Sequence, residues 1–256
     1  MIAVILAGGY GTRISEESAI KPKPMIEIGT RPIIWHLMKS LSEQGISDFV
    51  ICLGYKGYLI KEFFANYSIH TADLTVDLSS GKQTTLKSWT EDWRVTLIDS
   101  GEDALTAERL KRVREYVGES PFLFTYGDGL SDVAIGDLVN HHKVNNNLVT
   151  VTAVQPQGRY GTLQINDENV TMFSEKTDSE QVWVNGGFFI VDPQVLELIP
   201  ATNVSWEQVV LPKLAADGNL GAFKHSGFWF AMDTLRDKNH LENLWNSGRA
   251  PWKNWL

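Results

Sequence analysis

Residues 2–13 read Ile-Ala-Val-Ile-Leu-Ala-Gly-Gly-Tyr-Gly-Thr-Arg, a hydrophobic run that leads directly into a glycine-rich segment. The six apolar residues predict a buried first strand. Glycines let the backbone turn sharply and bring several N–H groups close to a phosphate, and Arg13 adds a planar cation suited to bidentate contact. The segment therefore predicts a phosphate-binding turn. The simpler alternative is a glycine turn between strand and helix, with Arg13 in solvent.

The same alternation of strand and helix continues along the chain. Alternating strands and helices predict an α/β fold with a mostly parallel mixed sheet covered by helices. The Thr- and Ser-rich residues 71–93 predict an inserted antiparallel ribbon, and the second half of the chain predicts a smaller lobe. The predicted strands are residues 2–7, 49–53, 95–98, 122–125, 148–154, 161–165, 182–191 and 220–225, and the predicted helices are residues 33–41, 59–64, 106–117, 206–216 and 234–246.

The composition restricts the class of protein. The 256 residues carry a net charge of −8, which argues against a general nucleic-acid binder. Cys52 is the single cysteine, so an internal disulfide and a multi-cysteine zinc site are excluded and a reducing cytoplasm is expected. No apolar run reaches the ~18 residues of a membrane span, and no basic segment precedes the first strand as it would in a signal peptide. We expect a cytoplasmic protein with small-molecule partners and with neither nucleic acid nor membrane as a partner.

Two common phosphate motifs do not fit the glycine-rich segment. The dinucleotide-binding fingerprint needs a third glycine where Ile14 stands, and the P-loop needs Gly-Lys-Ser/Thr, which is absent. Eight residues after Arg13 comes Lys21-Pro22-Lys23-Pro24, whose alternating prolines exclude a helix and predict a stiff, extended segment. A rigid lysine beside a phosphate loop suits phosphate binding, although a solvated proline segment is the alternative.

Taken together, these two segments resemble the sugar-1-phosphate nucleotidyltransferase family. The resemblance covers nearly the whole chain and is strongest to the branch that transfers a cytidylyl group to glucose 1-phosphate. It implies a Rossmann-like nucleotidyltransferase fold in one domain, residues 1–256, with a nucleotide-binding part at about 1–135 and a sugar-binding and metal-completing part at about 136–256. The motifs of that branch are Lys-Pro-Lys-Pro-Met at 21–25, Gly-Tyr-Lys-Gly at 54–57, Phe-Thr-Tyr-Gly-Asp-Gly at 124–129, Asn-Gly-Gly-Phe-Phe at 185–189 and Met-Asp-Thr-Leu-Arg-Asp at 232–237.

The resemblance implies a reaction. CTP and α-D-glucose 1-phosphate would give CDP-glucose and pyrophosphate, with Mg²⁺ as cofactor, in a homo-oligomer that supplies a CDP-sugar for deoxysugar or O-antigen-type lipopolysaccharide synthesis. The sugar phosphate is itself the nucleophile, so catalysis would depend on in-line positioning and charge neutralisation. The same chemistry with dTTP, UTP or another sugar 1-phosphate is one alternative. A non-catalytic sugar-nucleotide sensor is another, and an oxidoreductase is disfavoured by the missing third glycine.

The resemblance also assigns roles to individual residues. Asp128, after the strand at 122–125, and Asp233, before the helix at 234–246, would hold Mg²⁺ together. Taken alone, the first also fits a tight Asp-Gly turn and the second a helix N-cap. Arg13 and Lys23 would be catalytic. The nucleotide would be bound by Leu6, Ala7, Gly8, Gly9, Gly11, Thr12, Arg13, Lys23, Thr106, Arg109 and Gly127, and the sugar phosphate by Gly161, Glu175, Lys176, Asn185 and Gly186.

Two segments depart from the family pattern. Leu-Thr-Ala-Glu-Arg at 105–109 stands where the branch has Met-Thr-Gly-Gly-Arg, and Thr106 also fits the N-cap of the next helix. Thr177 stands where a proline often follows Glu-Lys, and Glu175-Lys176 alone would fit a solvated charged pair. The C-terminal residues 248–256 include Trp252 and Trp255, so we expect this tail to be covered by its own subunit or to lie at a subunit contact.

Overall fold

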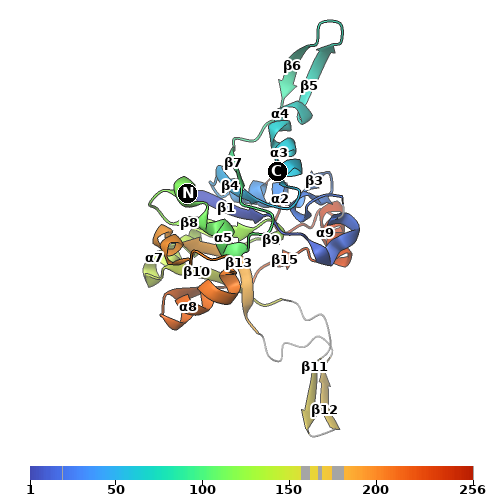
Figure 1. Ribbon diagram of the computed structural model, residues 1–256. Helices are drawn as coiled ribbons and strands as arrows, with labels where there is room; N and C mark the ends of the chain where they lie inside the picture. The colour runs from blue at the N-terminus through green and yellow to red at the C-terminus, as the bar shows by residue number, and fades with distance from the viewer. Residues whose placement is uncertain (19, 157–161, 167–168, 175–181, 256) are drawn as a thin grey trace.

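The computed structural model describes residues 1–18, 20–156, 162–166, 169–174 and 182–255. A seven-stranded sheet lies at its centre, in the order β14-β10-β13-β8-β1-β4-β7 (Figure 1). Four neighbouring pairs are parallel, and β13 is antiparallel to both β8 and β10, which confirms the predicted mostly parallel mixed sheet. The strands are β1 Ile2–Ala7, β4 Asp48–Leu53, β7 Arg94–Asp99, β8 Phe122–Tyr126, β10 Val149–Val154, β13 Val184–Val191 and β14 Leu220–His225.

Each of the predicted helices forms, two of them with differences, whereas α7 was not predicted. The predicted helix at 106–117 is two helices, and the turn between them buries Val113. Residues 206–210 form a π-helical turn before the α-helix begins, because Pro212 has no N–H for an α-helical bond and fits only a first turn. The helices are α1 Ser15–Ser18, α2 Ile33–Ser42, α3 Gly57–Ala65, α4 Tyr67–His70, α5 Thr106–Lys111, α6 Arg114–Val117, α7 Ile135–Asn145, α8 Leu211–Ala216 and α9 Leu235–Asn246.

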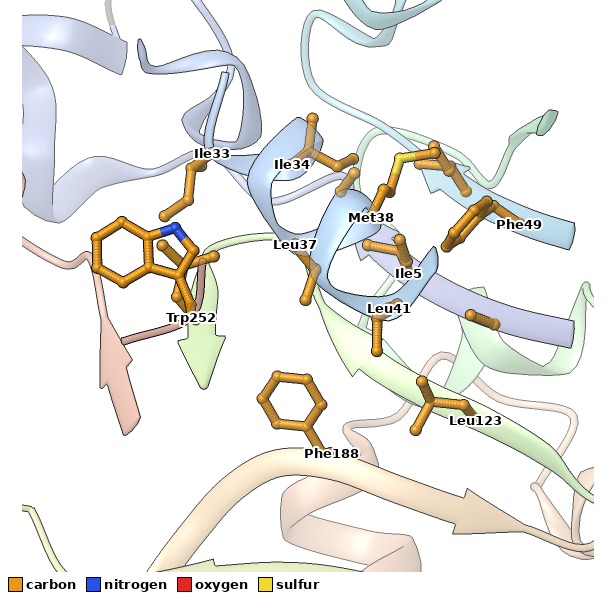
Figure 2. Packing of buried hydrophobic residues seen from close by; sticks show 14 of the residues in the cluster. Ile5, Ile33, Ile34, Leu37, Met38, Leu41, Phe49, Leu123, Phe188 and Trp252 are labelled. Carbon is orange, nitrogen blue, oxygen red and sulfur yellow. The ribbon is translucent and has the colours of Figure 1, made fainter. Parts of the chain in front are cut away.

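Strand β1 shows why both faces of the sheet are covered. Ala3 and Ile5 belong to one apolar cluster and Val4 and Leu6 to another, because successive side chains of a strand face opposite sides. The first cluster contains the apolar stripe of α2, which lies over Ile5 in Figure 2. The second contains buried residues of α5 and α8. The glycine-rich segment after β1 is therefore anchored by a strand buried on both sides.

Four short antiparallel pairs of strands lie outside the central sheet in the described part of the chain. The predicted ribbon is β5 Ala72–Asp77 with β6 Lys82–Ser88, and a second ribbon is β11 Thr162–Asn166 with β12 Asn169–Ser174; both extend away from the body (Figure 1). Smaller pairs are β2 Glu27–Ile28 with β3 Arg31–Pro32, and β9 Gly129–Ser131 with β15 Trp229–Ala231. Among the described helices, none has the length and the apolar character needed to cross a bilayer.

The C-terminal tail packs on its own chain. Trp252 is fully buried in the cluster that contains α2 (Figure 2), and its indole N–H points to Nδ1 of His36 at 3.5 Å. Trp255 lies edge-on to Trp35, with ring centroids 5.7 Å apart. Of the two expectations for the tail, the structure therefore bears out cover by the same subunit.

Candidate active site

A cavity of about 600 Å³ opens where β1 and β8 end. The crevice at the carboxyl ends of parallel strands is where open α/β sheets bind ligands, and the volume is in the range of small-molecule sites. The predicted nucleotide and metal residues meet here, although they come from four separate parts of the sequence. Those that line the cavity are Leu6, Ala7, Gly8, Gly9, Gly11, Thr12, Lys23, Thr106, Arg109, Gly127, Asp128 and Asp233.

Arg109 holds the glycine-rich loop in place by a hydrogen bond to the loop backbone. The residue is 5% exposed, and its guanidinium donates to the carbonyl oxygens of Gly8 at 3.1 Å, Leu53 at 3.0 Å and Glu102 at 2.9 Å, and to Ser100 Oγ at 2.9 Å. Burial lowers the pKa of Arg109 from its ordinary value. A Cβ on Gly8 would lie 2.0 Å from Arg109 Nη1, so only glycine leaves room for the guanidinium. Arg109 thus lines the cavity while its guanidinium donates to backbone carbonyl oxygens and to one hydroxyl of the protein itself.

The next residues of the loop turn tightly. Gly11 has φ +65°, a left-handed conformation that favours glycine, and its carbonyl oxygen accepts from Ser18 Oγ at 2.9 Å. Arg13 follows in a 3₁₀ turn, Thr12–Ile14, and its side chain lies outside the described part of the structure. The predicted role of Arg13 therefore stays a prediction.

Lys23 lies between the two predicted metal carboxylates. Its Nζ donates to Asp128 Oδ2 at 2.6 Å and to Asp233 Oδ1 at 2.7 Å, and its side chain is only 11% exposed. Burial by itself lowers the pKa of Lys23, but the two carboxylates outweigh burial and raise it above its ordinary value. The predicted extended segment is wrong at this point: Lys23–Met25 form a 3₁₀ turn, which the fixed φ of Pro24 allows.

Strand pairing explains how two aspartates about a hundred residues apart come together. Asp128 directly precedes β9 and Asp233 closely follows β15, and these strands pair antiparallel, with Met232 N donating to Asp128 O at 3.0 Å. Asp233 is not the helix cap, because Thr234 caps α9 and forms a capping box with Asp237. Both carboxylates therefore remain directed at a cation, here the ammonium of Lys23.

The same two carboxylates suit a hard divalent ion. In the described residues no three His, Cys, Asp or Glu side chains converge as metal ligands. Mg²⁺ is commonly held by one or two carboxylates together with substrate phosphates and waters, so two carboxylates are sufficient. A cationic group already fits between Asp128 and Asp233, which shows that the space between them accepts positive charge.

Three acidic residues that line the cavity were not predicted, Glu102, Asp103 and Glu207, and Glu207 is the least exposed of them. Glu207 lies in the π-helical turn and accepts hydrogen bonds from Thr106 Oγ1 at 2.6 Å, from Ser205 Oγ at 2.7 Å and from the hydroxyl of Tyr126. Burial raises the pKa of Glu207, but these hydroxyl donors outweigh burial and lower it. The hydroxyl of Thr106 therefore donates to the carboxylate of Glu207, and Thr106 does not cap α5. In the sequence, Glu207 looked only like an acidic residue in the first turn of a helix.

The predicted sugar-phosphate residues are only partly described. Gly161, Glu175 and Lys176 lie outside the described residues. Asn185 and Gly186 lie on β13 beside the cavity wall, where Gly186 O accepts from the indole N–H of Trp229 at 2.6 Å and Asn185 forms a hydrogen bond with Tyr126. The structure therefore brings two of the five to the neighbourhood of the cavity.

Comparison with known proteins agrees with this architecture. Residues 2–235 match the family described as nucleotidyl transferase. The chain is 51% identical to a glucose-1-phosphate cytidylyltransferase of Salmonella typhimurium and 41% identical to a probable glucose-1-phosphate cytidylyltransferase of Bacillus subtilis, in each case over the full length of both chains. The crystal structure of HddC from Yersinia pseudotuberculosis has the same fold, with a TM-score of 0.70 and 24% identity over 95% of this chain and 99% of that one. The chain therefore belongs to the nucleotidyl transferase family.

Proposed function

We propose that this chain joins CTP and α-D-glucose 1-phosphate to give CDP-glucose and pyrophosphate. The observation that carries the proposal is the cluster at the cavity, in which Lys23 meets Asp128 and Asp233 beneath a glycine-rich loop. The choice of substrates is supported by the relatives named glucose-1-phosphate cytidylyltransferase, one of them 51% identical over the full length. CDP-glucose made in this way would supply sugar for polysaccharide synthesis.

The reaction needs no nucleophile from the protein. A phosphate oxygen of glucose 1-phosphate attacks the α-phosphorus of CTP, a new P–O bond forms, and the bond to the departing pyrophosphate breaks. The chain's contribution is to align these groups and to offset their negative charge. Backbone N–H groups of residues 8–12 would hold the phosphates, Lys23 would meet the charge at the α-phosphate, and Arg13 would meet the leaving pyrophosphate.

Asp128 and Asp233 are the residues that would hold Mg²⁺. When bound, Mg²⁺ supplies positive charge that offsets the charge of the phosphates and polarises the phosphorus. The two carboxylates fit this role because they are oxygen donors, converge on one point and lie at the cavity that would receive the triphosphate. Gly161, Glu175, Lys176, Asn185 and Gly186 remain the proposed contacts of the sugar phosphate.

A homo-oligomer is the proposed assembly. The β5–β6 ribbon extends from the body and exposes Leu78 at 90% and Leu86 at 67%, an arrangement that a neighbouring copy would cover (Figure 1). Light scattering should give a mass that is a multiple of the 28.7 kDa of one chain. A mass of one chain at micromolar concentration would refute this assembly.

Pyrophosphate release tests the reaction. The purified protein would be assayed with CTP, UTP, dTTP and GTP, each against glucose, mannose and galactose 1-phosphates in the presence of Mg²⁺. We expect the highest kcat/KM for CTP with glucose 1-phosphate. A clear preference for another nucleotide or sugar would mean that the protein catalyses the same reaction with those substrates instead. Tight nucleotide binding without any pyrophosphate release would instead favour the sensor.

A further inference from the structure

In the cluster around Glu207, all three hydroxyl groups donate their hydrogen bonds in the same direction, to the carboxylate. Thr106, Ser205 and Tyr126 come from three different elements, and all three point their hydroxyls at the one carboxylate. An ionised carboxylate can only accept hydrogen bonds, so each of the three protons is directed to Glu207. All four side chains also line the cavity.

Because their protons are already donated to Glu207, these hydroxyl groups can make further hydrogen bonds only as acceptors. Thr106 Oγ1 already accepts from Trp206 N at 2.8 Å, and Ser205 Oγ accepts from Gln208 N at 3.2 Å. Each of these oxygens keeps one lone pair. A ligand that reaches this wall would therefore find oxygen acceptors and no hydroxyl proton.

This wall carries the negative charge of Glu207, and Glu102 and Asp103 also line the cavity. Of the cations described at the cavity, Lys23 is bound to Asp128 and Asp233, and the guanidinium of Arg109 donates to the protein's own carbonyl and hydroxyl oxygens. A negative carboxylate with acceptor oxygens around it repels phosphate. The wall must therefore face the uncharged part of a substrate, which for the proposed substrates is the base, the ribose or the glucose ring.

We propose that Glu207 is a specificity-determining positioning residue, which holds the hydroxyls of Thr106, Ser205 and Tyr126 so that their oxygens accept hydrogen bonds from a neutral N–H or O–H donor of the substrate. The inference rests on the proposed function. Three groups of the substrates have this chemistry: the amino group of cytosine, a ribose hydroxyl and a glucose hydroxyl. Uracil and thymine carry a carbonyl oxygen where cytosine carries its amino group, so a wall of acceptors would disfavour them.

The variant Glu207→Gln tests this role. A glutamine keeps the shape, but its NH₂ end cannot accept, so at least one hydroxyl loses its acceptor and turns its proton elsewhere. The matched control is Glu108→Gln, because Glu108 lies in the same region, pairs with Arg112 at 3.1 Å and does not line the cavity. For each protein, kcat/KM would be measured for substrate pairs that differ by one donor.

Three pairs separate the sources of the donor. CTP against UTP reports on the amino group, CTP against 2′-deoxy-CTP on a ribose hydroxyl, and glucose 1-phosphate against its monodeoxy analogues on a glucose hydroxyl. We expect one of these selectivity ratios to fall at least about tenfold in Glu207→Gln, the scale of one lost hydrogen bond, and to stay unchanged in Glu108→Gln. If kcat/KM falls equally for all substrates and every ratio stays within about twofold, Glu207 serves only the fold and the proposal is wrong.

Two further variants keep the test decisive if Glu207→Gln does not fold. Ser205→Ala and Tyr126→Phe each remove one hydroxyl and leave the carboxylate with its other donors. At least one of them should lower the same selectivity ratio about fivefold, and unchanged ratios in both would overturn the proposal. Failure of the proposed function is visible separately, in the wild type: if it prefers another nucleotide, the ratios are measured with that nucleotide and its analogues.

Discussion

At the scale of single residues, Lys23 occupies a position that two functions require. Its ammonium bridges Asp128 and Asp233, which are the proposed ligands of Mg²⁺, and it is also the proposed partner of the α-phosphate. Lys23 and a bound Mg²⁺ would therefore compete for the same two carboxylates in the free protein. Arrival of the triphosphate would give the lysine a new anionic partner and release the carboxylates for the metal.

This competition gives a testable result. Lys23→Met removes the ammonium and keeps a similar stem, so Mn²⁺, used as a probe for Mg²⁺, should bind at least about tenfold more tightly in the absence of nucleotide, because the carboxylates are no longer neutralised. The control is Lys21→Met, since Lys21 lies two residues away and pairs with Glu27 at 2.5 Å on the surface. Calorimetric titration with Mn²⁺ measures both, and equal affinities in wild type and Lys23→Met would contradict the competition.

At the scale of elements, the patterns that predicted best are those set by local spacing. The apolar run of β1 and the apolar stripe of α2 gave correct elements, because each pattern is set by how the residues of one element are buried. The place of Asp128 just beyond the end of a buried strand was also predictable, because the residue closely follows the apolar run at 122–125. These features depend on neighbours in the sequence.

Features that depend on contacts between distant segments were missed. Thr106 and Glu207 are 101 positions apart, so no pattern of neighbouring residues in the sequence predicts their hydrogen bond. Arg109 lines the cavity and stays a predicted nucleotide contact, but its hydrogen bond to Gly8, 101 positions away, was not foreseen. The π-helical turn at 206–210 follows from Pro212, a signal that was present in the sequence but was not used.

The brace between Arg109 and the glycine-rich loop can be tested with two adjacent glycines. In Gly8→Ala the new methyl group would lie 2.0 Å from Arg109 Nη1 and 2.9 Å from Gly54 N, so the guanidinium must move and lose hydrogen bonds. We expect a loss of about 1–3 kcal/mol in the free energy of unfolding, measured with urea. Gly9→Ala is the matched control, because its methyl group would meet no atom within 4 Å. Equal stability of the two variants would show that the loop gives way without cost.

At the scale of the whole molecule, the C-terminal tail closes the apolar cluster formed by α2 and the sheet. Trp252 is fully buried there (Figure 2), and its ring lies next to those of His36 and Phe228. Trp252→Ala should lower the free energy of unfolding by about 3–5 kcal/mol, because a large cavity replaces the indole. Lys253→Ala, an exposed neighbour, should change it by no more than about 0.5 kcal/mol. A small effect of Trp252→Ala in urea unfolding would mean that the tail contributes little to the core.

The same cluster makes the stability of the protein depend on pH through His36. Its Nε2 lies 2.8 Å from the carbonyl oxygen of Ile28 and must donate, and its Nδ1 faces the indole N–H of Trp252 and must accept, so the folded state requires the neutral ring. Burial lowers the pKa of His36 from 6.5 to about 4. Between these two values the unfolded chain binds a proton that the folded chain does not, so stability falls as the pH drops from about 6.5 to 4 and is unaffected by His36 above that range.

The pH dependence can be measured directly. Between pH 7.5 and pH 5, His36 should cost the wild type about 2 kcal/mol in the free energy of unfolding, on the scale of about 1.4 kcal/mol per pKa unit. His36→Gln carries no titrating group at this position, so its loss over the same interval should be smaller by that amount, even if the variant is less stable at both pH values. His70→Gln, which changes an exposed histidine at the end of α4, should keep the wild-type dependence. If urea unfolding gives wild type and His36→Gln the same pH dependence, His36 is protonated in the folded protein, and the hydrogen bond from Trp252 to Nδ1 does not form near pH 5.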